Sequence, residues 1–331
     1  YYVLSALREL SSCLLEANKA AAIEPFSAEL LQVLKALIAS GDEGKRSVAA
    51  ECLGKLCLLV PQALCSAILE MYTDSSKENR TVAAIATRFA LCSGTTASSI
   101  SDRIRFISEF FYGHSDAIIA LVSDPEVQVR RAALVTLNSV IRHNSLLIPG
   151  ETLRKNVAPL VLRETEIRNE LVEKIRVGTN VIVQDHGLEA RKVAFDCLSA
   201  ILLACSDALD LGSILSHLGA GLRDDNDIVI MAINACARLI SSFDSQVFLP
   251  LFDKEITPAL EQLLFPPKSN KNVDPNSDSH FELKRAALRL VALIKALPSV
   301  TTSAPAFSKM VSVSISSNQS LAETLKEIET A

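Results

Sequence analysis

Histidine is a frequent general acid or base and the commonest metal-binding side chain, and this chain has five. They are His114, His143, His186, His217 and His280. No two have the His-x-x-x-His or His-Glu-x-x-His spacing that brings two imidazoles to one face of a helix. We interpret all five as surface or helix-end residues, so the sequence predicts no histidine metal site.

Acidic and glycine-containing stretches also lack the spacing that chemistry requires. Asp224, Asp225 and Asp227 do not fit the calcium loop of an EF-hand, and a helix N-cap explains them better. The fragments GDEG (41–44) and GKL (54–56) lack the spacing of a phosphate loop, and no Gly-x-Ser-x-Gly or dinucleotide motif occurs. The chain is therefore predicted to have no catalytic residues, no cofactor, no metal and no small-molecule substrate.

Pairs of basic residues recur along the chain, and we expect them to form ion pairs rather than to take part in covalent chemistry. They are Lys45-Arg46, Arg130-Arg131, Arg191-Lys192 and Lys284-Arg285. Because they share one register of a repeating phrase, they would form a ladder along one ridge of a stacked array. Such a ladder is either a charged stripe for a partner or a set of ion pairs between adjacent turns, and we favour the ion pairs.

Composition limits the partner classes. The chain has 331 residues, is 49% hydrophobic and 21% charged, and carries a formal net charge of -5. It therefore offers no basic field to hold a nucleic-acid backbone. Its longest apolar runs, such as 56–60, are far shorter than the roughly 20 residues that span a bilayer. We predict neither a nucleic-acid nor a membrane partner.

The eight cysteines lie mostly inside apolar helical patterns, and none has Cys-x-x-Cys spacing. They are Cys13, Cys52, Cys57, Cys65, Cys92, Cys197, Cys205 and Cys236. We predict that they are reduced core residues of an intracellular protein. The chain opens with YYVLSALREL, without Met and already in helical register, which indicates a fragment of a longer protein.

One phrase recurs along the chain: a polar turn, one or two basic residues, then a helix that starts with small apolar residues. The copies span 41–56, 78–89, 124–140, 187–202, 225–240 and 279–291. Between them lie second helical segments, for example 28–40, 209–222 and 252–264. Recurring helix pairs of about 40 residues are typical of HEAT and armadillo proteins. We predict an all-α superhelix over residues 1–331, a single solenoid of roughly seven or eight pairs.

Two stretches interrupt the helical pattern. Residues 266–280 (PPKSNKNVDPNSDSH) are typical of an exposed loop. Residues 175–187 (IRVGTNVIVQDHG) combine β-branched residues with a Gly-Thr-Asn turn signal, and the sequence predicts a β-hairpin insertion at about 174–187. Val181 and Val183 would share one face of it and Ile182 the other, so a protruding hairpin cannot hide both faces. Packing of these residues on the solenoid, as an irregular loop, is the alternative.

Four phrases are specific enough to indicate a family: RSVAAECLGKL (46–56), DPEVQVRRAALVTLNSV (124–140), GLEARKVAFDCL (187–198) and ELKRAALR (282–289). Together with the ending at 315–329, they resemble the C-terminal part of the cullin-associated and neddylation-dissociated proteins. The resemblance follows the same order over nearly the whole chain. Residues 1–40 and 90–120 match least, and the side chains of 179–184 are more β-branched than is usual in the family.

The resemblance implies a cytoplasmic and nuclear regulator that has no catalytic activity. It would bind the cullin scaffold, with its RING subunit, of cullin-RING ubiquitin ligases. The C-terminal part would lie on the cullin N-terminal domain, compete with the adaptor of the substrate receptor and promote receptor exchange and ligase assembly. The hairpin would enter the adaptor's site. Its candidate contact residues are Ile175, Val177, Gly178, Thr179, Asn180, Val181, Ile182, Val183, Gln184 and Asp185.

Two other functions are compatible with an acidic helical solenoid. One is a nuclear transport receptor of the importin-β type, which would bind a small GTPase through N-terminal repeats. The other is a scaffold subunit of a phosphatase. The phrases quoted above argue against the transport receptor, and the absence of any catalytic motif argues against intrinsic catalysis in the second case.

Overall fold

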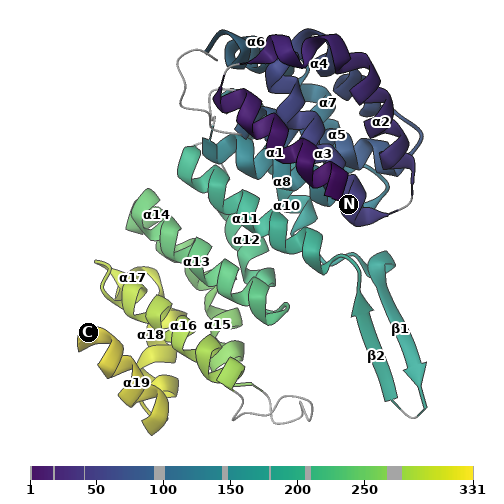
Figure 1. Ribbon diagram of the computed structural model, residues 1–331. Helices are drawn as coiled ribbons and strands as arrows, with labels where there is room; N and C mark the ends of the chain where they lie inside the picture. Colours follow the sequence, from purple (N-terminus) through teal and green to yellow (C-terminus); the bar gives the residue numbers. More distant parts are fainter. Residues whose placement is uncertain are drawn as a thin grey trace. The chain divides into compact units, whose positions relative to one another are not determined.

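The computed structural model describes residues 2–17, 19–40, 42–92, 101–143, 148–178, 180–205, 210–266 and 278–330, with only the backbone given at 101–103, 180 and 278–280. Helices joined by loops make up most of it, and the one sheet in these ranges is a two-stranded hairpin (Figure 1). The prediction of an all-α chain with one hairpin insertion is confirmed. The chain folds into two compact units, residues 1–161 and 162–331.

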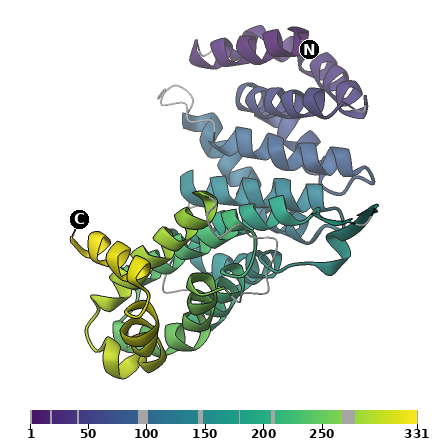
Figure 2. The same cartoon turned by 90° about the horizontal axis from the view of Figure 1, so that it is seen from below.

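The first unit is built on a run of long helices that pack side by side. α1 packs on α3, α3 on α5 and α5 on α8, and Figure 2 shows these helices as successive layers in the purple to blue-green part of the ribbon. Helices α2 and α4 pack against this run. The helices of this unit are α1 (Tyr2–Glu16), α2 (Ser27–Ala39), α3 (Glu43–Leu59), α4 (Pro61–Met71), α5 (Lys77–Cys92), α6 (Ser101–Gly113), α7 (Ser115–Ala120), α8 (Val127–His143) and α9 (Gly150–Thr152), and α10 (Ala158–Glu164) contains the division between the units.

The second unit repeats this arrangement and carries the hairpin. α11 packs on α13, α13 on α16 and α16 on α19. The hairpin strands are β1 (Val172–Val177) and β2 (Asn180–Asp185). The helices are α11 (Leu188–Ala204), α12 (Leu211–Gly221), α13 (Asn226–Ser242), α14 (Ser245–Glu255), α15 (Thr257–Leu264), α16 (Asp278–Lys295), α17 (Val300–Ser303), α18 (Pro305–Lys309) and α19 (Gln319–Thr330).

The repeated phrase predicts the stacked helices correctly, because all six copies fold into them: α3, α5, α8, α11, α13 and α16. The small residues of the phrase lie at the contacts, and Ala49, Ala133 and Ala194 have no exposed surface. Gly54 shows how close the helices come, since a Cβ added there would lie 2.4 Å from the carbonyl oxygen of Ala86. Small side chains therefore set the spacing between α3 and α5.

Two predicted segments differ from the structure. The single helix expected at 252–264 is broken at Ile256 into α14 and α15, because Pro258 at the start of α15 has no N–H to continue the helix. Residues 278–280, which were expected in the loop at 266–280, are instead the first residues of α16. Asp278 and the following Ser are favourable residues for a helix start, which the loop interpretation overlooked. Residues 267–277 lie outside the described residues.

The histidine interpretation is correct for three positions and wrong for one. His114 precedes α7, His143 ends α8, and His186 lies exposed after β2. His217 instead lies inside α12, where its Nδ1 is 2.8 Å from the carbonyl oxygen of Ser213 and its Nε2 is 3.2 Å from Glu166. The side chain of His280 is outside the described residues.

Most of the cysteines lie in the core, as predicted. Cys52, Cys57, Cys65, Cys197 and Cys236 are buried, and Cys92 and Cys205 are half-buried. Cys13 is the exception, because its position in α1 faces solvent. Within the described ranges, none of the helices has the length and apolar character needed to cross a membrane.

Candidate protein-binding hairpin

The hairpin projects from the helices of the second unit as a ribbon of two antiparallel strands (Figure 1). In its register Ile175 pairs with Ile182, Arg176 with Val181 and Lys174 with Val183. The strands begin earlier than the predicted insertion, at Val172, and end at Asp185. The sequence Val-Glu-Lys at 172–174 has no simple apolar alternation, so the start of β1 was not visible from the pattern.

The two faces of the hairpin differ in chemistry. Cross-strand partners share a face, so Ile175, Val177 and Ile182 lie together on one side. The opposite face carries Val181 and Val183 beside two cations. These are Lys174 and Arg176, which face the valines directly across the sheet. The first face therefore carries apolar side chains above the pair Glu173 and Gln184 near its base, and the other combines apolar and basic side chains.

Both faces are open to solvent. The exposed fraction of the apolar hairpin residues is 37% for Ile175 and 53–59% for Val177, Val181, Ile182 and Val183. Strands of this composition usually bury one face. The alternative that these residues pack on the solenoid as an irregular loop is wrong, because the segment is a regular hairpin and its side chains remain exposed.

The tip of the hairpin is a short turn around Gly178. Its φ of 65° lies in the left-handed region, which glycine adopts without steric cost. Thr179 and the side chain of Asn180 lie outside the described residues. Gln184, the residue before the last one of β2, is exposed. Asp185 ends β2 and is the predicted contact residue that lies at the base of the hairpin.

Asp185 is part of a network that fixes the base of the hairpin to the helices. Its Oδ2 accepts a hydrogen bond from Nη1 of Arg191 at 2.6 Å, and its Oδ1 accepts one from the N–H of Gly187 at 2.8 Å. The N–H of His186 donates to the carbonyl oxygen of Leu171 at 3.0 Å, which closes the base across the two strands. The carboxylate of Asp185 is thus committed within the chain.

Arg191 extends this network to the next repeat. Its Nε and Nη2 each donate to Asp224 at 2.9 Å, and both side chains are almost fully buried, 4% exposed for Arg191 and 7% for Asp224. Burial by itself lowers the pKa of Arg191, but the bonds and charges of Asp224 and Asp185 outweigh it, so the pKa lies above its ordinary value. The guanidinium stays charged and holds the hairpin base against the loop before α13.

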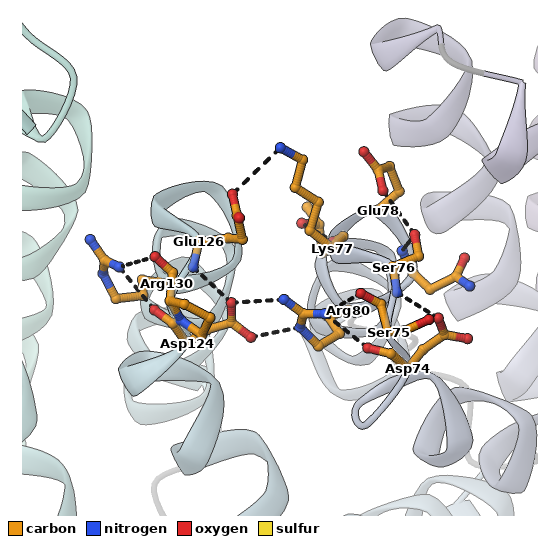
Figure 3. A network of polar contacts seen from close by, with 12 residues as sticks. Asp74, Ser75, Ser76, Lys77, Glu78, Arg80, Asp124, Glu126 and Arg130 are labelled. Atoms are coloured by element: carbon orange, nitrogen blue, oxygen red, sulfur yellow. Dashed lines mark hydrogen bonds and ion pairs between the residues drawn. The ribbon is translucent and has the colours of Figure 1, made fainter.

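The same device occurs in the first unit (Figure 3). Arg80 of α5 forms a double hydrogen bond to Asp124, which lies in the loop before α8, at 2.6 and 3.0 Å. Its Nη1 also donates to the carbonyl oxygens of Asp74 and Ser75. Arg130 in turn donates to the carbonyl oxygens of Asp124 and Pro125. Of the basic pairs predicted to form a ladder between adjacent repeats, Arg191 and Lys192 form ion pairs with Asp224 and Asp227 of the next repeat. Arg80 makes the same kind of contact with Asp124, although it is not one of the predicted pairs.

A spacing in the sequence marks this ladder, although it was not used to predict it. An aspartate precedes each of the three arginines by six positions, in the pairs Asp74 and Arg80, Asp124 and Arg130, and Asp185 and Arg191. The prediction also missed Lys174 and Arg176 on the basic face and Asp224 at the base. Asp225, by contrast, is the predicted N-cap, since its side chain accepts from the N–H of Asp227.

No group of three or more His, Cys, Asp or Glu side chains within the described residues is placed to hold a metal ion. Charged groups at the base of the hairpin are instead paired with each other. Lys192, for example, forms ion pairs with Asp227 at 2.8 Å and Glu189 at 3.1 Å, which raise its pKa. The hairpin is thus an exposed apolar and basic surface on a fixed base, and its geometry is suited to contact with another macromolecule.

Known proteins with this fold are large helical solenoids. A crystal structure of importin beta superposes with a TM-score of 0.61 at 15% identity, covering 90% of this chain and 34% of that one. A structure of Kap95p with RanGDP gives a TM-score of 0.64 at 13% identity, covering 98% and 39%. At these identities the likeness shows the fold alone, and it confirms the HEAT and armadillo class.

Comparison of sequences is more specific. A family model described as TATA-binding protein interacting (TIP20), of the TIP120 family, matches residues 151–314. Cullin-associated NEDD8-dissociated protein 2 of Rattus norvegicus is 30% identical over 330 residues, which is 99% of this chain and 24% of that protein. The chain thus spans about a quarter of the length of this relative.

Two further relatives agree. Cullin-associated NEDD8-dissociated protein 1 of Drosophila melanogaster is 30% identical over 299 residues, or 90% of this chain and 23% of that protein. In Emericella nidulans the similar protein is named as the C-terminal part of cullin-associated NEDD8-dissociated protein 1, with 28% identity over 85% of this chain. By its repeated helices, its hairpin and these matches, the chain belongs to the family of cullin-associated NEDD8-dissociated proteins.

Proposed function

We propose that the chain binds the N-terminal domain of a cullin and competes there with the adaptor of the substrate receptor. The hairpin would be the competing element, and the chain would promote receptor exchange and ligase assembly without catalysing a reaction. The names of the relatives support a cullin partner. A location in cytoplasm and nucleus, where such ligases assemble, belongs to the same proposal.

The observation that carries this proposal is the exposure of five β-branched apolar side chains on a hairpin whose base is fixed. Burying one Val or Ile at an interface contributes about 1.5 to 3 kcal/mol, so two or three of them contribute several kcal/mol before the costs of association. The anchoring by Arg191 to Asp185 and Asp224 reduces those costs, because the hairpin is ordered before it binds.

Competition would arise from overlap of surfaces. The hairpin would occupy part of the adaptor's footprint on the cullin, and a short-lived complex of all three proteins would then release the adaptor. In such a complex each partner lowers the affinity of the cullin for the other by the same factor.

The test is binding of this chain to the N-terminal domain of a cullin, measured with and without the adaptor. The variant replaces Val181, Ile182 and Val183 with threonine, which keeps the β-branched shape of the strand. We expect this variant to fold normally and to bind the cullin domain at least about tenfold more weakly, since each tenfold is about 1.4 kcal/mol. The adaptor should displace the unsubstituted chain.

A control shows whether the loss is specific to the hairpin. Val247 on α14 and Leu293 on α16 are also exposed apolar residues in the second unit, and their replacement by threonine and glutamine should leave binding unchanged. Undiminished displacement of the adaptor by the hairpin variant would reject the hairpin as the competing element. Absence of binding by the unsubstituted chain would reject the cullin domain as its partner.

A further inference from the structure

A groove of about 250 Å³ runs along α5 between α3 and α8 in the first unit. Its floor is apolar and is formed by Val82 and Ile85 of α5 and by Ala132 and Val135 of α8. The lining extends along α5 from Glu78 to Arg88, ten positions or about 15 Å at the rise of an α-helix. This length matches about five residues of an extended peptide.

Three arginines line the groove, and each comes from a different helix. Arg46 belongs to α3, Arg88 to α5 and Arg131 to α8. In the part of the chain that the structure describes, none of the three forms an ion pair or a hydrogen bond with an acidic side chain. The guanidinium of Arg88 lies 4.8 Å from the ring centroid of Phe89, a contact that leaves its N–H groups available to a ligand.

The neighbouring arginines of the same helices behave differently. Arg80 is bonded to Asp124 of the next repeat, and the buried Arg130 donates to the carbonyl oxygens of Asp124 and Pro125 before its own helix. Arg131, the next residue along α8, is exposed and lines the groove instead. Its counterpart in the second unit, Lys192, is paired with Asp227 and Glu189. The first residue of a pair such as Arg130-Arg131 therefore has a structural role. The second residue is paired in the second unit, as Lys192 is, but Arg131 of the first unit lines the groove.

Acidic side chains lie at one end of the groove and set its polarity. Glu43 and Glu78 are in the first turns of α3 and α5. The hydroxyl of Ser76 holds the pKa of Glu78 below its ordinary value, and the charges of Lys77 and Arg46 add smaller contributions. Glu78 is therefore ionised and already hydrogen-bonded, and the remaining positive charge lies in the middle and at the far end of the groove.

We propose that this groove binds an extended acidic segment of a partner protein. Carboxylates of the segment would bridge Arg46 and Arg131 on the two walls, and an apolar side chain between them would lie on Ile85 and Val135, the partly exposed apolar residues of the groove. Guanidinium groups suit this task because they bind carboxylates through two parallel hydrogen bonds. This site is separate from the hairpin and does not depend on the function proposed for it.

Chemistry favours a peptide over a nucleic acid in this groove. The chain has a net charge of -5, and Glu43 and Glu78 would repel a continuous row of phosphates. The apolar floor also has no counterpart in a phosphate backbone but suits a Leu or Val side chain. A segment in which acidic and apolar residues alternate fits both the walls and the floor.

The test uses a short fluorescein-labelled peptide in which leucine and glutamate alternate, titrated with the whole chain and followed by fluorescence anisotropy. We expect binding that weakens with salt, and at least about tenfold weaker binding of the same peptide with glutamine in place of glutamate. The double variant R46Q and R131Q should lose at least about tenfold in affinity, and R46E with R131E should lose more.

Two controls make the outcome unambiguous. Arg105→Gln on α6 removes an exposed arginine of the same unit that lies outside the groove and pairs with Glu109, so it should leave peptide binding unchanged. The hairpin variant with threonine at 181–183 should also bind the peptide normally, which separates this site from the proposed cullin contact. Equal binding by the groove variants, or no binding by the unsubstituted chain, would overturn the proposal. Displacement of the peptide by a single-stranded oligonucleotide of similar length would replace it with a phosphate site.

Discussion

At the scale of single residues, the ion pairs of this chain fall into two energetic classes. Exposed pairs such as Lys155 and Glu151 lie in water and contribute little to stability. The side chains of Arg191 and Asp224 are almost fully buried, and Arg191 is the cation that both Asp224 and Asp185 bind. Removing one partner of such a group leaves an uncompensated charge in the interior.

Replacing Arg191 with methionine should lower the free energy of unfolding by about 3 to 5 kcal/mol, because Asp224 is left buried without a cation. The measurement is urea unfolding at neutral pH. Lys192→Met is the matched control, since Lys192 is the adjacent residue and its ion pairs are partly exposed. It should cost less than about 1 kcal/mol. Equal stability of the two variants would show that the network does not fix the hairpin base.

The buried thiols give the chain a predictable response to alkaline pH. Burial raises the pKa of Cys236 to about 12 and that of Cys52 to about 11. In the unfolded chain both thiols ionise at about pH 8.5. Above that pH the folded state retains protons that the unfolded state has lost, so stability falls as the pH rises toward the folded values. Between the pKa values of the unfolded and folded states, each buried thiol lowers the free energy of unfolding by up to about 1.4 kcal/mol per pH unit.

Cys236→Ala should therefore flatten the pH dependence of stability between about pH 9 and pH 11. The slope of the urea midpoint against pH is the quantity to compare, because the small cavity left by the substitution shifts the midpoint equally at every pH. Cys13→Ala provides the control, since this thiol is exposed and its loss should leave the slope unchanged. A steeper slope for C236A would contradict the burial argument.

At the scale of elements, the hairpin is the feature whose two sides can be tested separately. Ile175, Val177 and Ile182 form one face, and Lys174 and Arg176 lie on the other with two valines. A ribbon that enters a cleft would use both faces, whereas one that lies on a flat surface would use only one. Because the register assigns each side chain to one face, the contribution of each face to the proposed cullin contact can be measured separately.

Lys174 and Arg176 should contribute to binding through electrostatic attraction. Replacing both with glutamate should slow association with the cullin domain and reverse or remove its salt dependence. Replacing Ile175 and Ile182 with threonine should instead speed dissociation, since apolar contacts act after the encounter. Surface plasmon resonance at two salt concentrations separates the two effects. If only one pair of substitutions matters, the hairpin binds through one face.

At the scale of the whole molecule, stability is distributed along runs of helices that contact their neighbours. In the second unit α11 packs on α13, α13 on α16 and α16 on α19. Such arrays behave as chains of nearest-neighbour interactions, so a local defect remains local. A destabilising substitution near one binding surface should therefore leave the stability of distant helices in the same unit unchanged.

Leu198→Ala in α11 tests this locality, because Leu198 has no exposed surface. The substitution should cost about 2 to 5 kcal/mol where the cavity forms. Hydrogen exchange followed by mass spectrometry should show faster exchange in α11 and α13 and little change in α16 and α19. Leu203→Ala, at an exposed position of the same helix, should leave exchange unchanged. A uniform loss of protection would indicate a single cooperative unit.

Much of the fold could be predicted because local sequence determines it. The repeated small residues at positions such as Ala49 and Ala133 set helix packing directly, and all six copies of the phrase became helices. Val181 to Val183 with Gly178 predicted a hairpin because β propensity and a positive φ are local properties. The single solenoid of seven or eight pairs remains a prediction.

Other features were decided only by the tertiary structure. The sequence alone did not show whether Arg191 binds a partner or another repeat, because Asp224 is 33 positions away and reaches it only after α11 and α13 have packed. The register that places Lys174 opposite Val183 depends on pairing between strands, not on either strand. The groove of Arg46, Arg88 and Arg131 likewise exists only where three helices meet. Local propensity fixes the elements, whereas contacts between distant residues determine which charges are paired and which remain available to a partner.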